Sequence, residues 1–236
     1  MISIIIPTLD EERYIGRILD ALQKQTFSEF EAIVVDGCSD DGTREIAEKY
    51  GFVRVINSSV RNVSYQRNLG AKEAKFERLL FLDADSHIGE DFLEKALKKI
   101  ERKKLAIAGC YLYPDSKSIF YKTAYFMFRK WIWFVSKVKS PELNGTCLFS
   151  TKKLHDKIGG FDHEITFAED YDYSSKASRF CKPELLNPVK IYTSVRRFET
   201  EGRILAGLKY LLMGGYITLF GNPKQGIFEY KFGHYK

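Results

Sequence analysis

The first half of the chain alternates short apolar runs with segments of helical periodicity, and this alternation restricts the fold more than any other feature. The apolar runs, which are typical of buried strands, are residues 3–7, 32–35, 53–56 and 79–82. Each run is followed by a segment with apolar side chains at helical spacing, such as residues 11–25. Repeated strand–helix units of this kind predict a parallel sheet with helices on both faces.

After Leu105 the strand-like and helical segments no longer alternate strictly. The strand-like runs there are residues 106–113, 146–150 and 189–195, and the helical segments are residues 118–137, 169–180 and 204–220. We therefore expect an α/β fold in which a mostly parallel central sheet is flanked by helices and followed by a C-terminal helical appendage.

Acidic residues follow three of the four strands predicted in the first half. Glu11 lies just after the first strand, Asp36 ends the second, and Asp83 and Asp85 follow the fourth. In open parallel sheets, ligands bind outside the carboxyl ends of the strands. Clustered like charges cost energy unless a cation or hydrogen-bond donors compensate them, so this edge is predicted to be a ligand site.

The segment Asp83-Ala84-Asp85 has the composition of a site for a hard cation. Mg²⁺ and Mn²⁺ take carboxylate and phosphate oxygens and need few protein ligands. A solvated turn with a helix-capping Asp is the structural alternative, and Asp170-Tyr171-Asp172 repeats the same pattern elsewhere. Neither G-x-G-x-x-G nor G-x-x-x-x-G-K-[ST] occurs, so a metal rather than a glycine-rich loop is expected to hold any phosphates.

An ordered set of short motifs resembles glycosyltransferase family 2, whose members are inverting enzymes of the GT-A (Rossmann-like) fold. The matching segments span roughly residues 1–200 and are Ser3–Glu12, Val34–Thr43, Arg67–Gly70, Leu80–Asp85, Gly159–Asp162 and Glu169–Asp170. Each segment is weak alone, and their order along the chain is what makes the resemblance specific.

The resemblance implies a role for each matching residue on the donor side. The residues implied to bind the nucleotide-sugar are Pro7, Thr8, Glu11 and Asp36, which would line the nucleoside pocket, with Arg67 at the base or ribose and Asp83 at the ribose or metal. The same resemblance makes Asp85 a ligand of Mg²⁺ or Mn²⁺, together with Asp83.

Asp170, in the Glu169-Asp170 pair, is implied to be the general base that deprotonates the acceptor. Such a base must lie near the acceptor and apart from the donor phosphates, which a helix starting after the Gly159-Gly160 loop would allow. Without the resemblance, these two residues read equally well as acids in the first turn of a helix.

Residues 194–198 resemble the Q-x-x-R-W segment of processive members, with Ser194 in place of Gln and Phe198 in place of Trp. This departure argues against processive polymerisation. The pair Arg196-Arg197 has the chemistry to hold a pyrophosphate or an acceptor phosphate, and Arg197 is assigned to the leaving diphosphate.

The resemblance implies one GT-A domain over residues 1–200, with a nucleotide-binding half at 1–104 and an acceptor half at 105–200. Residues 201–236 are expected to form a C-terminal helix and tail, packed on this domain or at the membrane surface. The chain is long enough, at 236 residues, for one large domain with a small appendage.

The expected activity is inverting transfer from a nucleotide-sugar, with UDP-sugars favoured, to an acceptor hydroxyl or lipid phosphate by metal-assisted single displacement. The expected partners are therefore a nucleotide-sugar donor and a glycan or lipid-linked acceptor. One alternative is a polyprenyl-phosphate sugar synthase at the membrane surface. A second is a non-catalytic basic module that binds nucleic acid or membrane, although acidic strand ends would repel phosphate, and nucleic acid is not an expected partner.

The net charge of +6 and the aromatic, basic segment at 119–135 favour an anionic partner. This segment reads either as an interfacial helix on anionic lipid or as a helix packed on the domain or at a dimer interface. Like residues 204–220, it lacks the uncharged apolar length of a membrane-spanning helix. With no basic leader before the first strand, the expected location is the cytoplasm or the inner face of the membrane.

Overall fold

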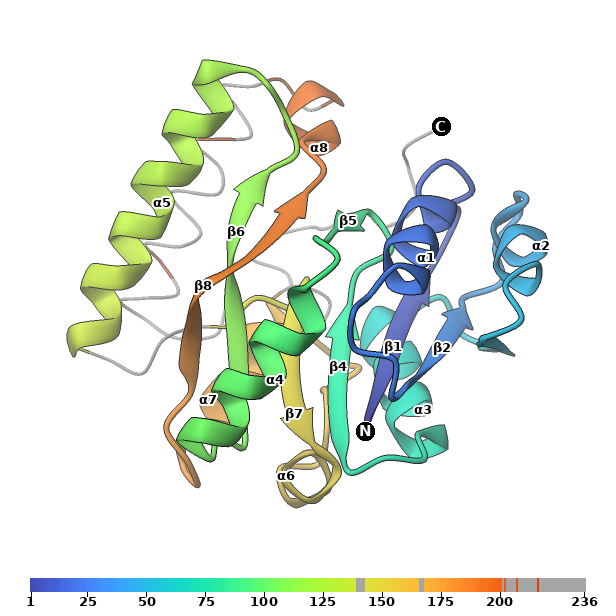
Figure 1. The fold of residues 1–236 in the computed structure, drawn as a ribbon, viewed down its shortest axis with the longest axis horizontal. Coiled ribbons are helices and arrows are strands. Elements are labelled where there is room, and N and C mark those ends of the chain that lie inside the picture. Colours follow the sequence, from blue (N-terminus) through green and yellow to red (C-terminus); the bar gives the residue numbers. More distant parts are fainter. Residues whose placement is uncertain (139–142, 166–167, 201, 203–206, 208–215, 217–236) are drawn as a thin grey trace.

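The computed structural model describes residues 1–138, 143–165 and 168–200, together with residues 202, 207 and 216. Within these residues the chain forms an 8-stranded sheet in the order β3-β2-β1-β4-β7-β6-β8-β5, which Figure 1 shows with helices on both sides. The strands are β1 (Ile2–Thr8), β2 (Phe30–Asp36), β3 (Val53–Asn57), β4 (Arg78–Leu82), β5 (Ser86–His87), β6 (Ala108–Pro114), β7 (Cys147–Thr151) and β8 (Glu184–Thr193). The expected α/β fold is confirmed.

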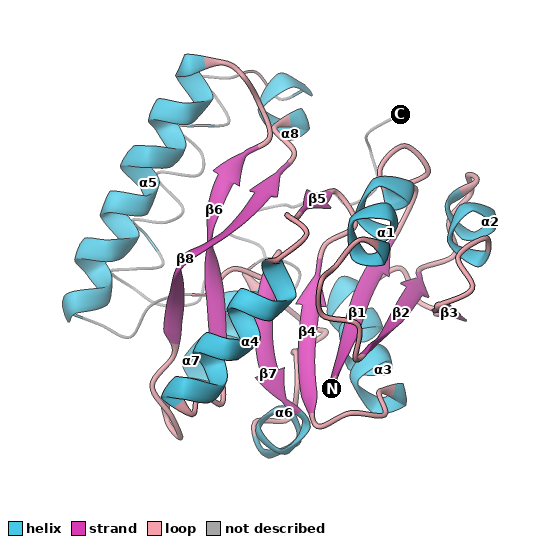
Figure 2. Ribbon diagram, in the orientation of Figure 1, coloured by secondary structure: helices cyan, strands magenta, loops and turns pink. Residues whose placement is uncertain are grey.

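The strands of the first half run parallel and those of the second half are mixed (Figure 2). Strands β3, β2, β1 and β4 are parallel neighbours, and β6 is parallel to β8. Strand β7 lies between β4 and β6 and is antiparallel to both, while the short β5 pairs antiparallel with β8. The carboxyl ends of β1, β2 and β4 therefore meet at one edge.

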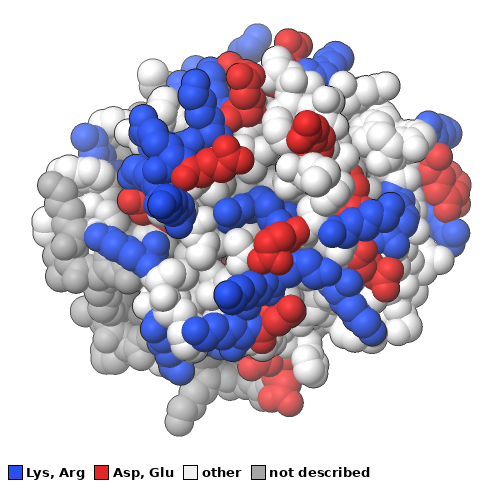
Figure 3. Space-filling model, turned by 60° about the horizontal axis from the view of Figure 1, so that its bottom comes forward, with Lys and Arg blue, Asp and Glu red and all other residues white. Residues whose placement is uncertain are grey.

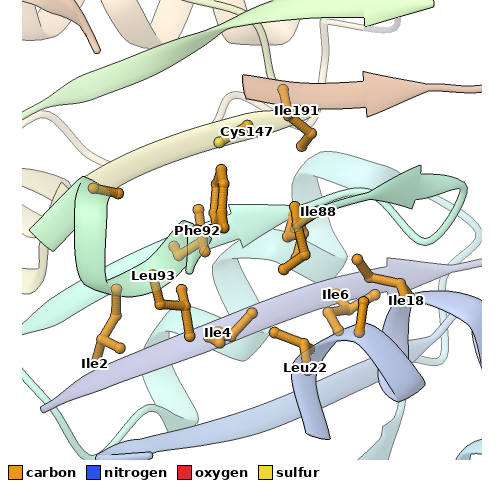
Figure 4. Packing of buried hydrophobic residues seen from close by; sticks show 14 of the residues in the cluster. Ile2, Ile4, Ile6, Ile18, Leu22, Ile88, Phe92, Leu93, Cys147 and Ile191 are labelled. Atoms are coloured by element: carbon orange, nitrogen blue, oxygen red, sulfur yellow. The ribbon is translucent and has the colours of Figure 1, made fainter. Parts of the chain in front are cut away.

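The helices cover both faces of the sheet because the parallel strands are apolar on both sides. They are α1 (Ile15–Gln23), α2 (Thr43–Glu48), α3 (Val63–Glu73), α4 (Phe92–Lys103), α5 (Ile119–Val138), α6 (Lys152–Lys157), α7 (Glu169–Ser178) and α8 (Arg196–Thr200). Helices α1 and α4 pack on one face, where Figure 4 shows Leu22 and Leu93 beside Ile4 of β1. Helices α3, α6 and α7 cover the other face.

Two features of the sheet differ from the sequence-based expectation. The strand expected at 189–195 begins at Glu184, and Pro188 lies where the register of the β6–β8 pairing shifts. Proline cannot donate to a ladder and is found at such irregularities, which is why the pattern before it did not read as a strand. The two-residue β5 was not foreseen, because so short a run carries no periodicity.

The surface charges are mixed on the face turned forward in Figure 3, where Lys and Arg side chains lie among Asp and Glu side chains. Pairs such as Lys103 and Glu184 (2.5 Å) bring opposite charges together on the surface. Across the described helices, none combines the length and apolar character needed to cross a bilayer. The appendage expected at 201–236 lies outside the described residues, apart from residues 202, 207 and 216.

Candidate active site

The ends of β1 and β2 place the first pair of expected site residues side by side. Thr8 and Asp36 are register partners in the parallel ladder, and the Thr8 hydroxyl donates to Asp36 Oδ1 at 3.1 Å. Both side chains are buried, as is Pro7 one residue earlier in β1. Asp36 also accepts from the backbone N–H and the hydroxyl of Ser39, at 3.0 and 2.6 Å. The carboxylate is thus fixed at the strand edge.

The loop after β1 is fastened to the loop after β2. The backbone N–H of Asp10 donates to Ser39 Oγ at 3.0 Å, and that of Glu11 donates to Thr43 Oγ1 at 2.7 Å. Thr43 is buried at the start of α2, so its hydroxyl is a fixed anchor. These bonds hold the Glu11 carboxylate over the carboxyl edge of the sheet.

Helix α3 connects the strand ends to the rest of the site. It begins after Asn62, whose side chain accepts from the Tyr65 N–H at 2.9 Å and so caps the helix. The buried amide of Gln66 donates to the carbonyl oxygens of Thr8 and Val35, both at 2.7 Å. One side chain therefore ties the start of α3 to the ends of β1 and β2. Its role was not foreseen from the sequence.

Arg67, the next residue of α3, joins the two halves of the site. Its guanidinium donates to Asp83 Oδ1 at 3.0 Å and to Glu169 Oε1 at 2.7 Å, and it lies 5.2 Å from the centre of the Phe161 ring. The side chain is only 3% exposed. Burial alone would lower the pKa of Arg67, but the Asp83 and Glu169 carboxylates raise it, so the group is a permanent cation.

Gly145 makes room for this arginine and fixes the expected base. A Cβ at position 145 would lie 2.9 Å from Arg67 Nη2, a distance that real Cβ atoms essentially never show. The backbone N–H of Gly145 donates to Asp170 Oδ2 at 2.7 Å. Burial, and then repulsion from the neighbouring Glu169 carboxylate, raise the pKa of Asp170 to about 7. This value suits a group that must accept a proton near neutral pH.

Arg196, at the start of α8, reaches the site from the other side. It forms a bidentate pair with Glu11, at 2.8 and 2.5 Å, and lies 4.6 Å from the centre of the Tyr14 ring. Its Nη2 is also 3.5 Å from Asp85 Oδ2. Burial raises the pKa of Glu11 even though Arg196 opposes the shift. The side chain of Arg197 lies outside the described part of the structure.

The donor set at Asp83 and Asp85 fits a divalent cation that shares its coordination with a ligand. Both carboxylates are partly exposed, and each faces an arginine that balances its charge. Among the described residues, no group of three or more His, Cys, Asp or Glu side chains could hold a metal by itself. A cation here would therefore complete its coordination with phosphate oxygens and water, as Mg²⁺ commonly does.

A clamp formed by Asn68 positions the segment that carries Phe161 beneath Arg67. The Asn68 amide donates to the Phe161 carbonyl at 2.7 Å, and its oxygen accepts from the Phe161 N–H at 2.9 Å. Gly160 stands beside this clamp with φ +66°, and a Cβ there would lie 2.6 Å from Asn68 Oδ1. The motifs at Arg67–Gly70 and Gly159–Asp162, which are far apart in the sequence, are thus in direct contact in the fold.

The Gly160→Ala variant is expected to lose about 2–4 kcal/mol of unfolding free energy, because it combines a left-handed backbone with a clash against the clamp. Gly159 is the matched control, since it has φ +76° but no atom within 4 Å of its Cβ position. Gly159→Ala should cost only about 1 kcal/mol, from backbone strain alone. Urea denaturation measures both values, and equal losses would rule out the clash.

The expected site residues fall into three groups, and the members of each group are in contact directly or through one arginine. Pro7, Thr8 and Asp36 lie at the ends of β1 and β2. Glu11 meets Asp85 through Arg196, and Asp83 meets Glu169, the neighbour of Asp170, through Arg67. Sequence reasoning gave no role to Gln66 and Gly145, and it named Glu169 and Arg196 only as the partners of Asp170 and Arg197 in sequence. Glu169 and Arg196 are next to residues that had been assigned, and the sequence did not show which side chain of each pair points toward the site.

An α/β sheet whose carboxyl edge gathers carboxylates around one buried and one partly buried arginine is the arrangement of a ligand-binding enzyme of the open-sheet class. The chain belongs to glycosyl transferase family 2, whose family model, described as Glycosyl transferase family 2, matches residues 3–163. The resemblance found in the sequence is thereby confirmed at the level of the family.

Two relatives illustrate the extent of the match. Poly(ribitol-phosphate) beta-N-acetylglucosaminyltransferase TarS of Staphylococcus aureus (strain Mu50) is 30% identical over 187 residues, which cover 74% of this chain and 32% of TarS. A glycosyltransferase of Haemophilus influenzae is 29% identical over 191 residues, covering 75% of this chain and 61% of that protein. The chain therefore spans only about a third of TarS.

Solved structures show the same fold. Residues 1–349 of S. aureus TarS in complex with UDP-GlcNAc match with a TM-score of 0.65 and 24% identity, covering 82% of this chain and 58% of that one. The mannosyltransferase PcManGT of Pyrobaculum calidifontis, in complex with GDP-Man and Mn²⁺, matches with a TM-score of 0.71 and 19% identity, covering 90% and 64%. These structures confirm the GT-A fold.

Proposed function

We propose that this chain transfers a sugar from a nucleotide-sugar, with UDP-sugars favoured, to the hydroxyl of a glycan or lipid-linked acceptor, with inversion at the anomeric carbon. The observation that carries the proposal is the link through Arg67 between Asp83, on the donor side, and the Glu169-Asp170 pair, whose Asp170 has a pKa of about 7. Donor and base groups thus share one buried cation. The relatives crystallised with UDP-GlcNAc or GDP-Man support a nucleotide-sugar donor.

On the donor side, the nucleoside would lie against the ends of β1 and β2. Pro7, Thr8 and Asp36 form its floor, and Glu11 closes one side. A divalent cation held by Asp83 and Asp85, Mg²⁺ or Mn²⁺, would supply positive charge against the diphosphate. Arg196 stands beside Asp85 and, with its neighbour Arg197, has the chemistry to bind the leaving diphosphate.

On the acceptor side, Asp170 takes the proton of the attacking hydroxyl. The hydroxyl oxygen forms a bond to the anomeric carbon while the bond from that carbon to the diphosphate oxygen breaks, and the electron pair leaves with the nucleoside diphosphate. Attack from the face opposite the leaving group inverts the configuration. Gly145 and Glu169 keep Asp170 in place and hold its pKa near the working pH.

A polyprenyl-phosphate sugar synthase is the second candidate function. One observation favours it: helix α5 exposes aromatic side chains beside lysines, which would suit a lipid-linked acceptor at a membrane. The two candidates differ in chemistry. A phosphate monoester is already ionised near pH 7, so it needs no base, whereas a hydroxyl does.

A thermal-shift panel tests the donor assignment directly. UDP at about 100 times its dissociation constant should stabilise the folded chain by about 2.7 kcal/mol, because a ligand that binds only the folded state shifts the equilibrium by mass action. The stabilisation should grow when Mn²⁺ is added. Asp85→Asn should remove this Mn²⁺-dependent increase but should not change the stabilisation by UDP without metal. GDP is the matched nucleotide control. If neither nucleotide raises the melting temperature with Mn²⁺ present, the donor proposal is wrong.

The pH dependence of transfer to a hydroxyl acceptor should report the pKa of Asp170. The base works only when it is deprotonated, so the rate should fall as pH drops through about 7. At pH 6 it should be about tenfold below its alkaline plateau, since one pH unit changes the deprotonated fraction of such a group about tenfold. Initial rates at saturating donor between pH 5 and 9 measure this. A rate that is flat down to about pH 5 would contradict the assignment.

A further inference from the structure

Helix α5 exposes far more apolar surface than any other described helix. Its large exposed side chains are Ile119, Phe120, Phe126, Met127, Phe128, Trp131, Trp133 and Phe134. Met127 is 63% exposed and Phe134 is 60% exposed. A contiguous apolar patch of this kind on a folded domain marks a site of interaction.

The inner side of α5 is firmly attached to the domain, so its outward face is fixed in direction. Tyr121 is buried and contacts the Phe198 ring of α8 at 5.8 Å. The Tyr125 hydroxyl is 3.1 Å from Thr193 Oγ1, and the Arg129 guanidinium lies 4.1 Å from the centre of the Tyr113 ring. Figure 1 shows α5 as a straight helix along the side of the molecule, beside β6 and β8. The exposed residues are therefore a rigid surface.

The outward residues form a continuous stripe. Phe120, Met127, Trp131 and Phe134 follow one another at spacings of seven, four and three, which places them on the same side of a helix. Phe126 and Trp133 flank the stripe, and the Lys130 ammonium lies 5.5 and 5.9 Å from the centres of their rings. Aromatic rings beside a lysine that can reach toward headgroups are typical of a membrane interface.

The positive charge of α5 favours an anionic partner over a second copy of the same helix. The helix has no Asp or Glu, and its exposed side chains include the lysines Lys122 and Lys130. A second copy of the same helix would bring these positive charges against one another, which disfavours self-association through this face. An anionic lipid surface complements the charge and also accepts the aromatic stripe.

We propose that the exposed face of α5 docks the protein on the surface of an anionic membrane, with Phe120, Met127, Trp131 and Phe134 inserted at the headgroup level and Lys130 at the lipid phosphates. The surface is independent of the proposed transfer reaction, because docking needs neither donor nor acceptor. Through Phe198, the docked helix touches α8, whose first residue Arg196 reaches the candidate active site.

The two tryptophans of the chain, Trp131 and Trp133, are both exposed on α5, so tryptophan fluorescence, excited selectively over the tyrosines, reports on α5 alone. Vesicles of phosphatidylcholine with about one third phosphatidylglycerol should shift the emission of the full chain to shorter wavelength and allow quenching by brominated lipid. Vesicles of phosphatidylcholine alone should produce much less change. Raising the salt concentration should weaken the binding, because the attraction to anionic lipid is screened.

Two variants test the two halves of the surface by vesicle flotation. Phe120→Ser/Phe134→Ser removes part of the stripe, and Lys130→Glu reverses the charge beside it. Each should lower the partition coefficient at least about tenfold, while melting temperature and UDP binding stay unchanged. Phe180→Ser is the matched control, because Phe180 is 51% exposed and has Lys157 4.0 Å from its ring centre, but lies outside α5. It should bind vesicles like the wild type.

Unchanged flotation of both variants would overturn the proposal. So would a blue shift that appears without vesicles as protein concentration rises, with sedimentation showing dimers that Phe120→Ser/Phe134→Ser dissociates, since the face would then be a protein interface. Binding to single-stranded nucleic acid in preference to anionic vesicles would overturn it as well. None of these outcomes bears on the donor proposal, which the nucleotide panel tests separately.

Discussion

Asp170→Asn is expected to lower the rate of transfer to a hydroxyl acceptor about 100- to 10,000-fold, the range that general-base catalysis typically contributes. Asparagine keeps the size of the side chain and can still accept the Gly145 N–H, but it cannot take a proton. Binding of UDP and Mn²⁺ should persist, because Asp170 is not among the donor ligands. Single-turnover rates with saturating donor separate the chemical step from binding.

The fold of this variant should remain intact, and the pKa explains why. The pKa of Asp170 is raised in the folded chain, so ionisation opposes folding once the pH passes the ordinary value for Asp, and the full cost is present above about 7. A neutral Asn carries no such cost. The Asn side chain loses the bond in which the Tyr171 N–H donates to Asp170 Oδ1 at 2.8 Å, so Asp170→Asn should be about as stable as the wild type at pH 8. Glu164→Gln, an exposed acid before α7, is the control for activity.

The same variant distinguishes the two candidate functions. A hydroxyl acceptor depends on the base, while an ionised polyprenyl phosphate does not. Near-wild-type transfer to both kinds of acceptor would remove Asp170 from the mechanism. A large loss with hydroxyl acceptors alone would support the glycan or lipid-linked hydroxyl as the natural acceptor.

Arg67→Met is expected to destabilise the fold by about 3–5 kcal/mol, because it leaves two carboxylates at the site without their shared cation. Met keeps much of the length and packing of the side chain, so the loss reflects the missing charge and hydrogen bonds. Arg44→Met is the matched control. Arg44 pairs with Glu48 on the surface, with both side chains 48% exposed, and losing such a pair costs about 1 kcal/mol or less.

Arg67→Met should also change the pH dependence of the transfer rate. Arg67 lowers the pKa of Asp170, and its removal also leaves the Glu169 charge unbalanced. Both changes raise the pKa of Asp170, so the fall in rate should begin at a higher pH than in the wild type. If Arg67→Met and Arg44→Met lose the same stability and share one pH profile, then Arg67 does not link the two sides of the site.

The first half of the fold could be predicted from the sequence because its signals are local. A buried parallel strand is a short apolar run, and the runs at 3–7, 32–35, 53–56 and 79–82 became the cores of β1 to β4. The position of β7 between β4 and β6 could not be predicted in this way. Periodicity indicates that a segment is a strand, but it does not indicate which strands pair or in which direction.

The candidate site was predictable as a set of acids but not as a network. The sheet edge could be inferred from the parallel strands, so Glu11, Asp36, Asp83 and Asp85 were expected to gather there. The pairs Arg67–Glu169 and Arg196–Glu11 join residues 102 and 185 positions apart, and nothing local specifies them. Adjacent residues on a helix also point about 100° apart, so the sequence alone could not choose between Arg196 and Arg197.

The interleaving of strands limits how such a domain can be recombined. Strand β7, from the later part of the chain, is inserted next to β4, and β5, from the earlier part, completes the far edge beside β8. A chimera joined near residue 104 would thus have to rebuild two strand pairings, β4 with the incoming β7 and β5 with the incoming β8. Swapping acceptor specificity between relatives is better attempted in the loops at the carboxyl edge, where a graft leaves every ladder intact.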